Sequence, residues 1–349
     1  MSVILNEPGV VADSPKRSRG GVVWEVVKER PSAAVGAFLL GTFILIALFA
    51  TFLEPYGVHE QVGPVYGSPS AQHWLGLDDG GIDMVSLLIQ GGRISLVVGF
   101  AAALVATVIG GGVGILAGYF GGATDTVLMR ITDYFLVIPD VPLMIVVATI
   151  WGPSLSHIIV VIGILLWTTT ARIVRSQVKS VRERVYVKRA RSIGAGHLRL
   201  IFRHVLPQIA PLLIANVVLT VAVAIFDETA LAFLGLSDPS AVSWGSVIQH
   251  GFERTAISNG AWWAIVPPGI CVALVIMGCY LLGQAIEDAL NPRLKVAYLS
   301  VKGFRLRPLV GRGPDALCAR RCSRSTTCTC GSTSRTARSC TQCRAWASS

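Results

Sequence analysis

The chain has 349 residues, of which 52% are hydrophobic and 14% are charged. Several apolar runs approach or exceed the roughly 18–20 residues needed to cross a bilayer, which excludes a soluble globular protein. The formal charge of +10 could favour nucleic acid, but all of the 30 Lys/Arg residues except Arg93 and Arg254 fall on one side of the spans proposed below. This asymmetry indicates membrane topology with both termini in the cytoplasm, and we expect no nucleic-acid partner.

Hydropathy and charge predict an all-α polytopic membrane protein with about six transmembrane helices. A polar, basic cytoplasmic segment covers residues 1–31, and an uncleaved first span follows at 32–53. The other spans are expected at 95–120, 134–151, 158–173, 208–225 and 262–285, within a transmembrane domain at 32–295.

The loop that follows the first span, about residues 54–92, contains five acidic residues and no Lys or Arg before its end, which agrees with an outer location. It includes the run HWLGLDDGGID at 73–83. His73 with Asp78 and Asp83 offers a possible metal site. We favour the simpler interpretation, a turn-rich loop folded over the outer mouth, and expect no metal.

Glycines recur at every fourth residue of the second span, at Gly110, Gly114 and Gly118. Small residues at this spacing allow helices to approach closely in lipid. A phosphate-binding glycine loop would require a following Gly-Lys-Ser/Thr, and no lysine of this chain follows a glycine. ATP chemistry must therefore belong to a partner.

An acidic residue interrupts the third span. After a short inner connection at 121–133, the run Pro139-Asp140-Val141-Pro142 places a charge beside two helix-kinking prolines. Asp140 either faces a cavity or partner helix, as membrane-embedded acids generally do, or lies solvated near a helix end. Both interpretations stay open at this stage.

The most basic internal stretch, 174–207, lies between spans four and five. Within it, the apolar residues of Tyr186–Pro207 recur at spacings of three to five. This pattern predicts a short amphipathic helix, a turn at Gly194-Ala195-Gly196, and a second helix ending at Pro207. Such a unit could lie on lipid headgroups or dock into a groove on a partner protein.

Two further features follow span five. Asp227 and Glu228 could line the outer end of a translocation path and favour a substrate's free amine, or they could be acids wetted at a loop edge. The tail at 296–349 is rich in Cys, Ser and Arg and contains six of the eight cysteines. We expect it to be disordered, in the manner of an out-of-frame extension, rather than a zinc module.

Several of these segments together resemble one family. Ala190, Gly194, Leu206 and Pro207 match the cytoplasmic coupling loop of ABC importer permeases. The surrounding phrase is similar to the dipeptide/oligopeptide (peptide/nickel) branch, as are the run at 73–83, the segment DETALAFLGL with the later SWG, and EDALNPR near residue 293. The four segments occur in the family's order, over roughly residues 30–295.

The resemblance implies a type I ABC importer permease fold in a bacterial plasma (inner) membrane, and the C-type subunit that pairs with a second, homologous permease. Two ATP-binding domains would hold ATP and Mg, and an extracytoplasmic binding protein would deliver dipeptides or short oligopeptides. The chain itself would not be an enzyme. The expected ATPase-docking residues are Tyr186, Ala190, Gly194, His197, Leu198, Phe202 and Pro207.

Other functions remain possible at this stage. A nickel or glutathione importer shares the same motifs. A proton-driven secondary transporter could use Asp140, Asp227 or Glu228, although no clear internal repeat supports it. A membrane enzyme is not favoured, because no H-E-x-x-H or G-x-S-x-G motif lies in a span.

Overall fold

The computed structural model describes residues 31–290, and this part of the chain is helical without strands. The predicted cytoplasmic segment, apart from Pro31, and the Cys-rich tail at 296–349 lie outside the described residues. The first half contains α2 (Pro31–Leu48), α3 (Ala50–Leu53), α4 (Met84–Phe120), α5 (Gly122–Val137), α6 (Asp140–Trp151) and α7 (Leu155–Arg182). The second half contains α8 (Val185–Ser192), α9 (His197–Leu200), the π-helical turn η1 (Ile201–Val205), α10 (Leu206–Phe233), α11 (Trp244–Glu253), the 3₁₀ turn η2 (Trp262–Ala264) and α12 (Val266–Leu290).

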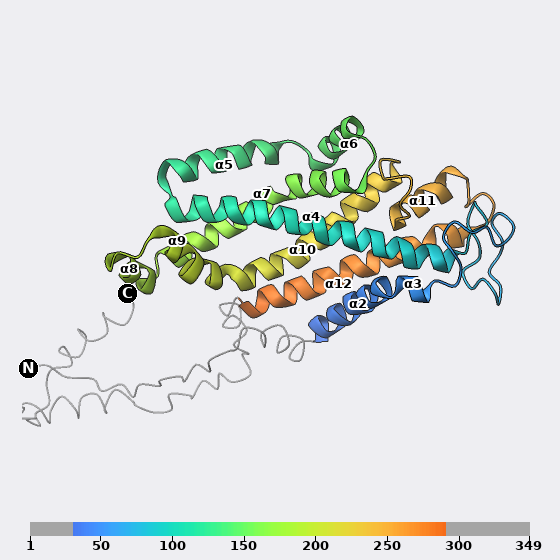
Figure 1. Ribbon diagram of the computed structural model, residues 1–349, viewed down its shortest axis with the longest axis horizontal. Helices are drawn as coiled ribbons and strands as arrows, with labels where there is room; N and C mark the ends of the chain where they lie inside the picture. Colours follow the sequence, from blue (N-terminus) through green and yellow to red (C-terminus); the bar gives the residue numbers. More distant parts are fainter. Residues whose placement is uncertain (1–30, 291–349) are drawn as a thin grey trace, which may run out of the picture. The chain divides into compact units, whose positions relative to one another are not determined.

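The long helices confirm a multi-pass membrane fold. Within residues 31–290, five helices are long and apolar enough to cross a bilayer, and the number rises to six if the bent pair α5 and α6 counts as one span. α4 lies beside α7 and α10, α12 packs against α10, and α2 covers α12 (Figure 1). Large apolar side chains such as Phe38 and Leu45 stay exposed on the outer face of α2. Exposed apolar surface of this kind suits contact with lipid.

The predicted glycine contact holds α4 against α7. A Cβ atom added at Gly114 would lie 2.7 Å from the Ala171 carbonyl oxygen, and one at Gly118 would lie 2.8 Å from Val178 Cβ. Gly110 faces the backbone of Trp167 in the same way. The two backbones therefore approach to a distance that side chains would prevent, which confirms the expectation from the four-residue spacing.

A second close contact packs α11 against α4 and α2. Trp244 at the start of α11 is buried, and its indole N–H donates to the Leu88 carbonyl oxygen at 2.9 Å. Gly91 and Gly92 on α4 leave the space for it, because a Cβ at Gly92 would meet the indole ring at 2.7 Å. Phe43 of α2 packs edge-on against the same ring. The short helix between spans five and six is thus fixed to α2 and α4.

The second span begins earlier than predicted, at Met84 rather than residue 95. Asp83 caps the helix, because its carboxylate accepts from the Ser86 amide at 3.0 Å. The sequence analysis extended the loop to about residue 92, whereas the cap determines the start of the helix. The outer loop is therefore shorter than expected and ends at Asp83.

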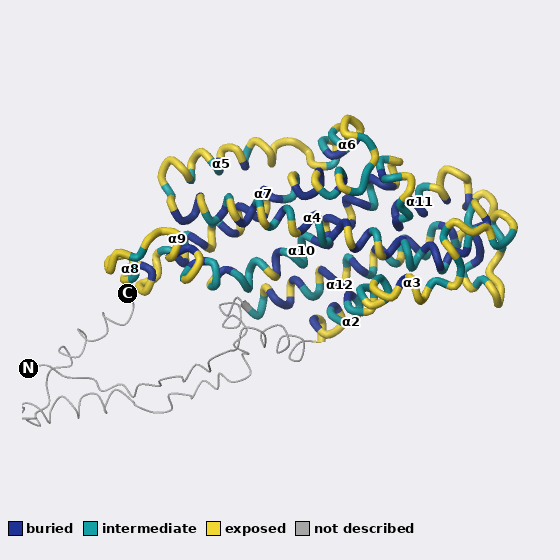
Figure 2. Tube along the Cα trace, viewed as in Figure 1, coloured by how far each residue is buried: buried dark blue, intermediate teal, exposed yellow. Residues whose placement is uncertain are grey.

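The third span is broken, and the expected inner connection at 121–133 is helical. It forms most of α5, which meets α6 at a bend of 86°. Ile138 adopts an extended conformation directly before Pro139, as residues that precede proline generally do. α5 remains largely exposed along its length (Figure 2).

The fourth span extends beyond residue 173, where it was expected to end, to Arg182. The reason is a set of ion pairs with α5. Asp125 of α5 binds both Arg175 and Lys179, the latter at 2.6 Å, and Asp133 binds Arg172 at 2.6 Å. The basic side chains that interrupt the apolar pattern after residue 173 form ion pairs that join α7 to α5.

Pro207 does not end the second coupling helix, contrary to the prediction. The Leu206 amide donates to the carbonyl oxygen of Ile201, five residues back, so the chain passes through a π-helical turn. Pro207 then lies in the first turn of α10, where a missing N–H is tolerated. His197–Phe233 consequently behaves as one span-length helix, and Asp227 and Glu228 lie inside it rather than at a wetted loop edge.

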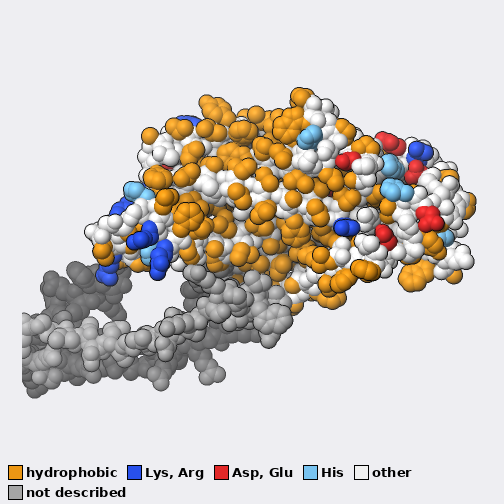
Figure 3. Space-filling view, viewed as in Figure 1, with side chains coloured by type: hydrophobic (Ala, Val, Ile, Leu, Met, Phe, Trp, Pro, Cys, Tyr) orange, Lys and Arg blue, Asp and Glu red, His pale blue; other side chains and the backbone are white. Residues whose placement is uncertain are grey.

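Charge separates to the two ends of the helices (Figure 3). We call the end with α8, α9 and the last turns of α7 the basic end. We call the end with the loops at 54–83 and 234–243 and with α11 the acidic end. Between them the visible surface is mostly apolar (Figure 3).

Candidate functional site

A helix-turn-helix unit at the basic end contains most of the predicted coupling residues. α8 and α9 are joined by a turn at 193–196, as expected. Gly194 has a φ of +87°, and a Cβ there would meet no atom within 4 Å. A left-handed conformation strains other residues, so glycine suits the turn for its backbone rather than for packing.

The unit is amphipathic, with one face buried and the other open. Val187, Leu200, Ile201 and Val205 are buried against the ends of α4 and α7. On the other side Leu198 is 72% exposed and Phe202 is 65% exposed. Val185, Tyr186, Ile193, Leu198 and Phe202 are the exposed apolar side chains of this unit, and we call them the coupling face.

Two predicted coupling residues, His197 and Ala190, make contacts toward the spans. His197 Nδ1 lies 3.0 Å from the Tyr119 hydroxyl, which belongs to the end of α4. The Arg191 guanidinium lies 5.5 Å above the buried Tyr119 ring. Ala190 is half-buried and packs on the inner cluster. His197 and Ala190 therefore attach the unit to the spans, while the coupling face points outward.

Charged side chains at the basic end make one hydrogen bond to the backbone and one exposed ion pair. Arg182 donates to the Tyr119 carbonyl oxygen at 2.9 Å. Lys188 Nζ lies 2.8 Å from Glu183, and this hydrogen bond lowers the pKa of the Glu183 carboxyl. Glu183 is fully exposed, so the pair contributes little to stability. The same charges keep the surface around the coupling face strongly basic.

The adjacent acids of α10 occupy different environments. Glu228 is buried, and its carboxylate accepts from the Ser95 hydroxyl of α4 at 3.0 Å. Asp227 is also buried, but its Oδ2 has no hydrogen-bond partner within the described part of the chain. Asp140, in the first turn of α6, is exposed. Leaving one buried carboxylate oxygen of Asp227 without a partner costs free energy.

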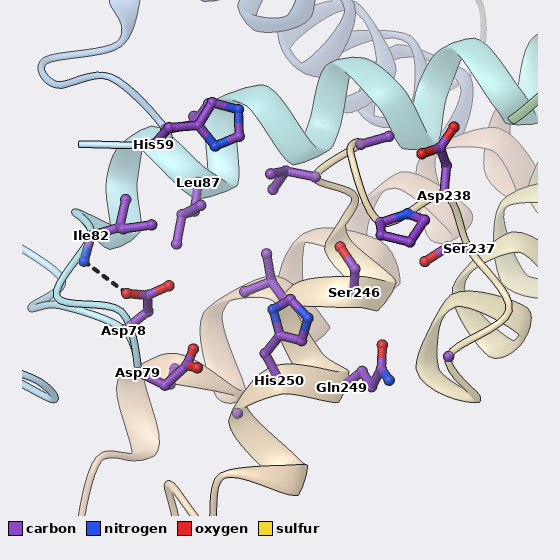
Figure 4. A pocket seen from close by; sticks show the side chains of 18 residues that line it. His59, Asp78, Asp79, Ile82, Leu87, Ser237, Asp238, Ser246, Gln249 and His250 are labelled. Carbon is purple, nitrogen blue, oxygen red and sulfur yellow. Dashed lines mark hydrogen bonds between the residues drawn. The ribbon is translucent and has the colours of Figure 1, made fainter. Parts of the chain in front are cut away.

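A pocket of about 330 Å³ opens among the loops of the acidic end (Figure 4). Asp78 and Asp79 line it from the outer loop, Ser237 and Asp238 from the loop after α10, and His250 from α11 (Figure 4). Burial raises the pKa of Asp78, although its carboxylate accepts from the amides of Gly80 and Ile82. Hydrogen bonds from Ser240 lower the pKa of Asp238.

The metal alternative for the outer loop finds no support in the geometry. His73 Nδ1 lies 2.9 Å from Asp83, which already caps α4. Asp78 turns instead to its own loop amides. Within residues 31–290, no group of three His, Cys, Asp or Glu side chains could hold a metal ion.

Comparison with known proteins relates these features to a family. Residues 110–296 match the family model described as binding-protein-dependent transport system inner membrane component. The chain belongs to this family. It is therefore the membrane-spanning component of a transport system.

Similar relatives cover most of the permease. The dipeptide transport system permease protein DppC of Alkalihalophilus pseudofirmus is 35% identical over 272 residues, which is 77% of this chain and 88% of that protein. The oligopeptide permease OppC of Bacillus subtilis is 33% identical, covering 75% of this chain and 86% of that protein. The glutathione permease GsiD of Pectobacterium atrosepticum is 31% identical, covering 82% and 95%. Among solved structures, an inward-facing MetNI methionine ABC transporter aligns with a TM-score of 0.47 at 20% identity, covering 60% of this chain and 96% of that chain.

Several structural residues of the permease were not predicted from its sequence. Tyr119 stood among the apolar residues at the end of a span, and nothing in its local pattern pointed to His197, 78 residues later. Ser95 gave no signal for its contact with Glu228. The basic residues of α7 recur at spacings of three and four, which could have indicated an ion-pairing helix face beyond residue 173.

Proposed function

We propose that this permease imports dipeptides or short oligopeptides, driven by ATP hydrolysis in partner subunits. The observation that carries the proposal is the identity to dipeptide and oligopeptide permeases over nearly their full length. The exposed coupling face at the end of the long helix supports ATPase coupling independently. Glutathione is itself a short peptide, so the glutathione relative supports the same substrate class.

The proposed orientation places the basic end in the cytoplasm. Lys and Arg concentrate around α7, α8 and α9, whereas the loop at 54–83 contains five acids and no Lys or Arg. Cytoplasmic loops of membrane proteins carry this excess of positive charge. Both termini would then lie on the cytoplasmic side of a bacterial inner membrane, and the acidic end would face outward.

The coupling face would dock in a cleft on an ATP-binding subunit. Val185, Tyr186, Ile193, Leu198 and Phe202 would bury their apolar side chains there, as amphipathic helices do in grooves. Gly194 would permit the turn between α8 and α9. His197 and Ala190 would hold the unit to α4 and α7. Pro207 would lie in the first turn of α10, which follows the unit. ATP and Mg would bind to the partner subunits, so this chain performs no bond-breaking chemistry.

The translocation path would run beside Asp227. Its unpaired buried carboxylate would favour the ammonium group of a peptide, and Asp140 on the exposed start of α6 would face a second, homologous permease. Glu228 would fix α10 against α4 beside the path, because it accepts a hydrogen bond from Ser95. An extracytoplasmic binding protein would deliver the substrate at the acidic end.

Uptake by the reconstituted complex tests the function. Vesicles containing the permease with its co-purified partners would receive ATP together with a labelled dipeptide or labelled Ni²⁺. We expect uptake of the dipeptide that requires ATP. In Gly194→Asp we expect that uptake to be lost while the complex still assembles, because a charged side chain would enter the apolar docking cleft.

A matched control separates docking from backbone strain. Gly260 at the acidic end also has a positive φ, +74°, and a Cβ there would also meet nothing within 4 Å. Gly260→Asp therefore introduces the same strain and charge away from the coupling face, and should retain uptake. Uptake of Ni²⁺ in place of peptide would change the substrate, and transport that needs a proton gradient but no ATP would refute the proposal.

A further inference from the structure

One basic side chain lies well inside a membrane helix and has no partner. Arg93 is in α4, nine residues after Met84, and it is exposed. Only Arg93 and Arg254 fall outside the basic side of the chain, and Arg254 lies 3.6 Å from Asp79. The Arg93 guanidinium makes no ion pair or hydrogen bond with any side chain of residues 31–290. A charged side chain within a span is costly, and it generally pairs with a partner or reaches the interface.

Arg93 is also the one charged residue of an apolar groove between α2 and α4. The groove has a volume of about 510 Å³, which lies within the range of about 300–1,000 Å³ found for ligand sites. Its lining residues are Ile44, Ala47, Leu48, Arg93, Leu96, Val97 and Phe100. Leu48 is 72% exposed and Val97 is 58% exposed, so the groove opens on the side of the helices that faces lipid.

A smaller apolar cavity adjoins the groove at Ala47, which lines both. Its volume is about 190 Å³, and its lining includes Trp244 of α11 and Cys271 of α12 but no charged residue. Packing of α2 against α4 next to Ala47 is therefore looser than the close contact of α4 with α7. Space of this kind suits a flexible hydrocarbon chain, which can follow irregular apolar walls.

The depth of Arg93 is suitable for contact with a headgroup. Leu48, across the groove, is the last residue of α2, and Glu54 of the outer loop follows six residues later. At 1.5 Å per residue this separation is at most about 9 Å. Arginine extends its guanidinium from apolar surroundings toward the headgroups. The guanidinium would therefore reach the level of the phosphates, with the apolar walls of the groove beneath it.

The chemistry of the groove favours a phospholipid over other occupants. A guanidinium binds phosphate oxygens through two parallel hydrogen bonds, and the apolar walls would accept an acyl chain. A free phosphate ion would leave those walls uncovered. An apolar helix of the second permease would bury the guanidinium without a counter-charge, which is strongly unfavourable. The peptide path proposed beside Asp227 lies on α10, which contributes no residue to the groove.

We propose that the groove binds one phospholipid of the outer leaflet, with its phosphate on Arg93 and one acyl chain between α2 and α4. The proposal relies on the proposed function only for the orientation that selects this leaflet. The lipid would supply the counter-charge that Arg93 lacks and would fill the space that the two helices leave. A net negative headgroup, such as that of phosphatidylglycerol, would bind more tightly than a zwitterionic one.

Photolabelling of the intact complex tests the site. The complex is placed in lipid nanodiscs with a trace of phosphatidylglycerol whose acyl chain carries a diazirine, and the labelled peptides are identified by mass spectrometry. The lipid control is a diacylglycerol with the same diazirine chain and no phosphate. One test variant is Arg93→Gln, and the other is Val97→Trp, which fills the groove without changing its charge.

Each test variant has a matched control. Arg254→Gln removes an arginine charge outside the groove. Val108→Trp adds the same bulk on α4 at a position that is 66% exposed and also outside the groove. Arg93→Lys keeps the positive charge and separates the loss of charge from the loss of the side chain.

We expect phosphatidylglycerol to label the stretches 44–48 and 96–100 in the wild-type complex. That labelling should fall about fivefold or more in Arg93→Gln and in Val97→Trp, and it should stay within about twofold of wild type in the two controls. Arg93→Lys should retain most of the labelling. Diacylglycerol should label these stretches weakly, with no difference between wild type and Arg93→Gln.

Several results would overturn the proposal. Equal labelling of wild type and Arg93→Gln by phosphatidylglycerol, or strong labelling by diacylglycerol, would mean that the phosphate plays no part. Loss of labelling on addition of inorganic phosphate, but not of chloride at equal ionic strength, would assign the guanidinium to a free anion. Absence of wild-type labelling in both stretches would leave the groove to the second permease.

The outcome can be separated from that of the transport assay. Labelling requires no transport, so a failure of peptide uptake would change the proposed function and leave the lipid site in place. Successful uptake together with unchanged labelling in Arg93→Gln would remove the lipid site and leave the transport function. If Arg93→Gln does not assemble, the comparison of Val97→Trp with Val108→Trp decides whether the lipid occupies the groove.

Discussion

Gly114→Ala should weaken the packing of α4 on α7, and Gly112→Ala should not. The added Cβ at Gly114 would lie 2.7 Å from the Ala171 carbonyl oxygen and 2.8 Å from Val174 Cβ. Ordinary contact begins at 3.4 Å, so the helices would have to separate by about 0.7 Å. At Gly112, two residues away on the same helix, an added Cβ meets nothing within 4 Å.

The pair of variants isolates the cost of the clash. Replacing glycine by alanine within a helix stabilises it by roughly 0.5–1 kcal/mol, and this gain is common to both positions. Overpacking a tight contact costs about 1–3 kcal/mol, and this term applies to Gly114 alone. The difference between the variants is therefore about 1–3 kcal/mol. At about 2–4 °C per kcal/mol for a chain of this size, Tm should differ by about 2–12 °C.

The measurement is thermal unfolding of each purified variant in the same detergent, followed by tryptophan fluorescence. Wild type should lie between the two variants or close to Gly112→Ala. Equal Tm values for the two variants would refute the reasoning, because they would mean that α4 and α7 do not touch at Gly114. A lower Tm for Gly112→Ala would refute it as well.

Three further predictions concern single polar groups. Tyr119→Phe keeps the buried ring but removes the hydrogen bond to His197, which should cost about 0.5–1.5 kcal/mol in unfolding free energy and lower uptake per ATP hydrolysed. Asp227→Asn should reduce peptide uptake without lowering Tm, since Oδ2 loses no partner, whereas Glu228→Gln should leave uptake closer to wild type. Because burial raises the pKa of Asp78, the folded protein binds its proton more tightly than the unfolded chain, so stability should fall as pH rises above about 3.8. Asp78→Asn, which retains an acceptor for the loop amides, should remove that fall in Tm; an unchanged pH profile would contradict it.

Sequence reasoning succeeded where a pattern acts locally. Apolar runs identified the membrane helices, the four-residue glycine spacing identified the α4–α7 contact, and Gly194 identified the turn. Each of these three predictions depends on periodicity or on the conformational range of one residue. Such signals require no knowledge of distant segments.

The failures share a different cause, because each depends on a partner far along the chain. α7 continues past residue 173 since Asp125, 50 residues earlier, neutralises Arg175. The chain stays helical at Pro207 because a π-helical turn leads into the first turn of α10, which no composition rule predicts. The sequence left Glu228 either on the translocation path or at a wetted loop edge, because its partner, Ser95, lies 133 residues away.

The π-helical turn at Ile201–Val205 has a mechanical consequence. It separates α9, which carries Leu198, from α10, which carries Asp227, so this turn would act as a pivot between the two residues. The 22 residues from Val205 to Asp227 span about 33 Å at 1.5 Å per residue. A tilt of about 10° at the pivot would therefore move the Asp227 carboxylate by about 6 Å, more than the width of a water molecule. A small displacement of Leu198 would therefore be enlarged at the membrane-embedded Asp227.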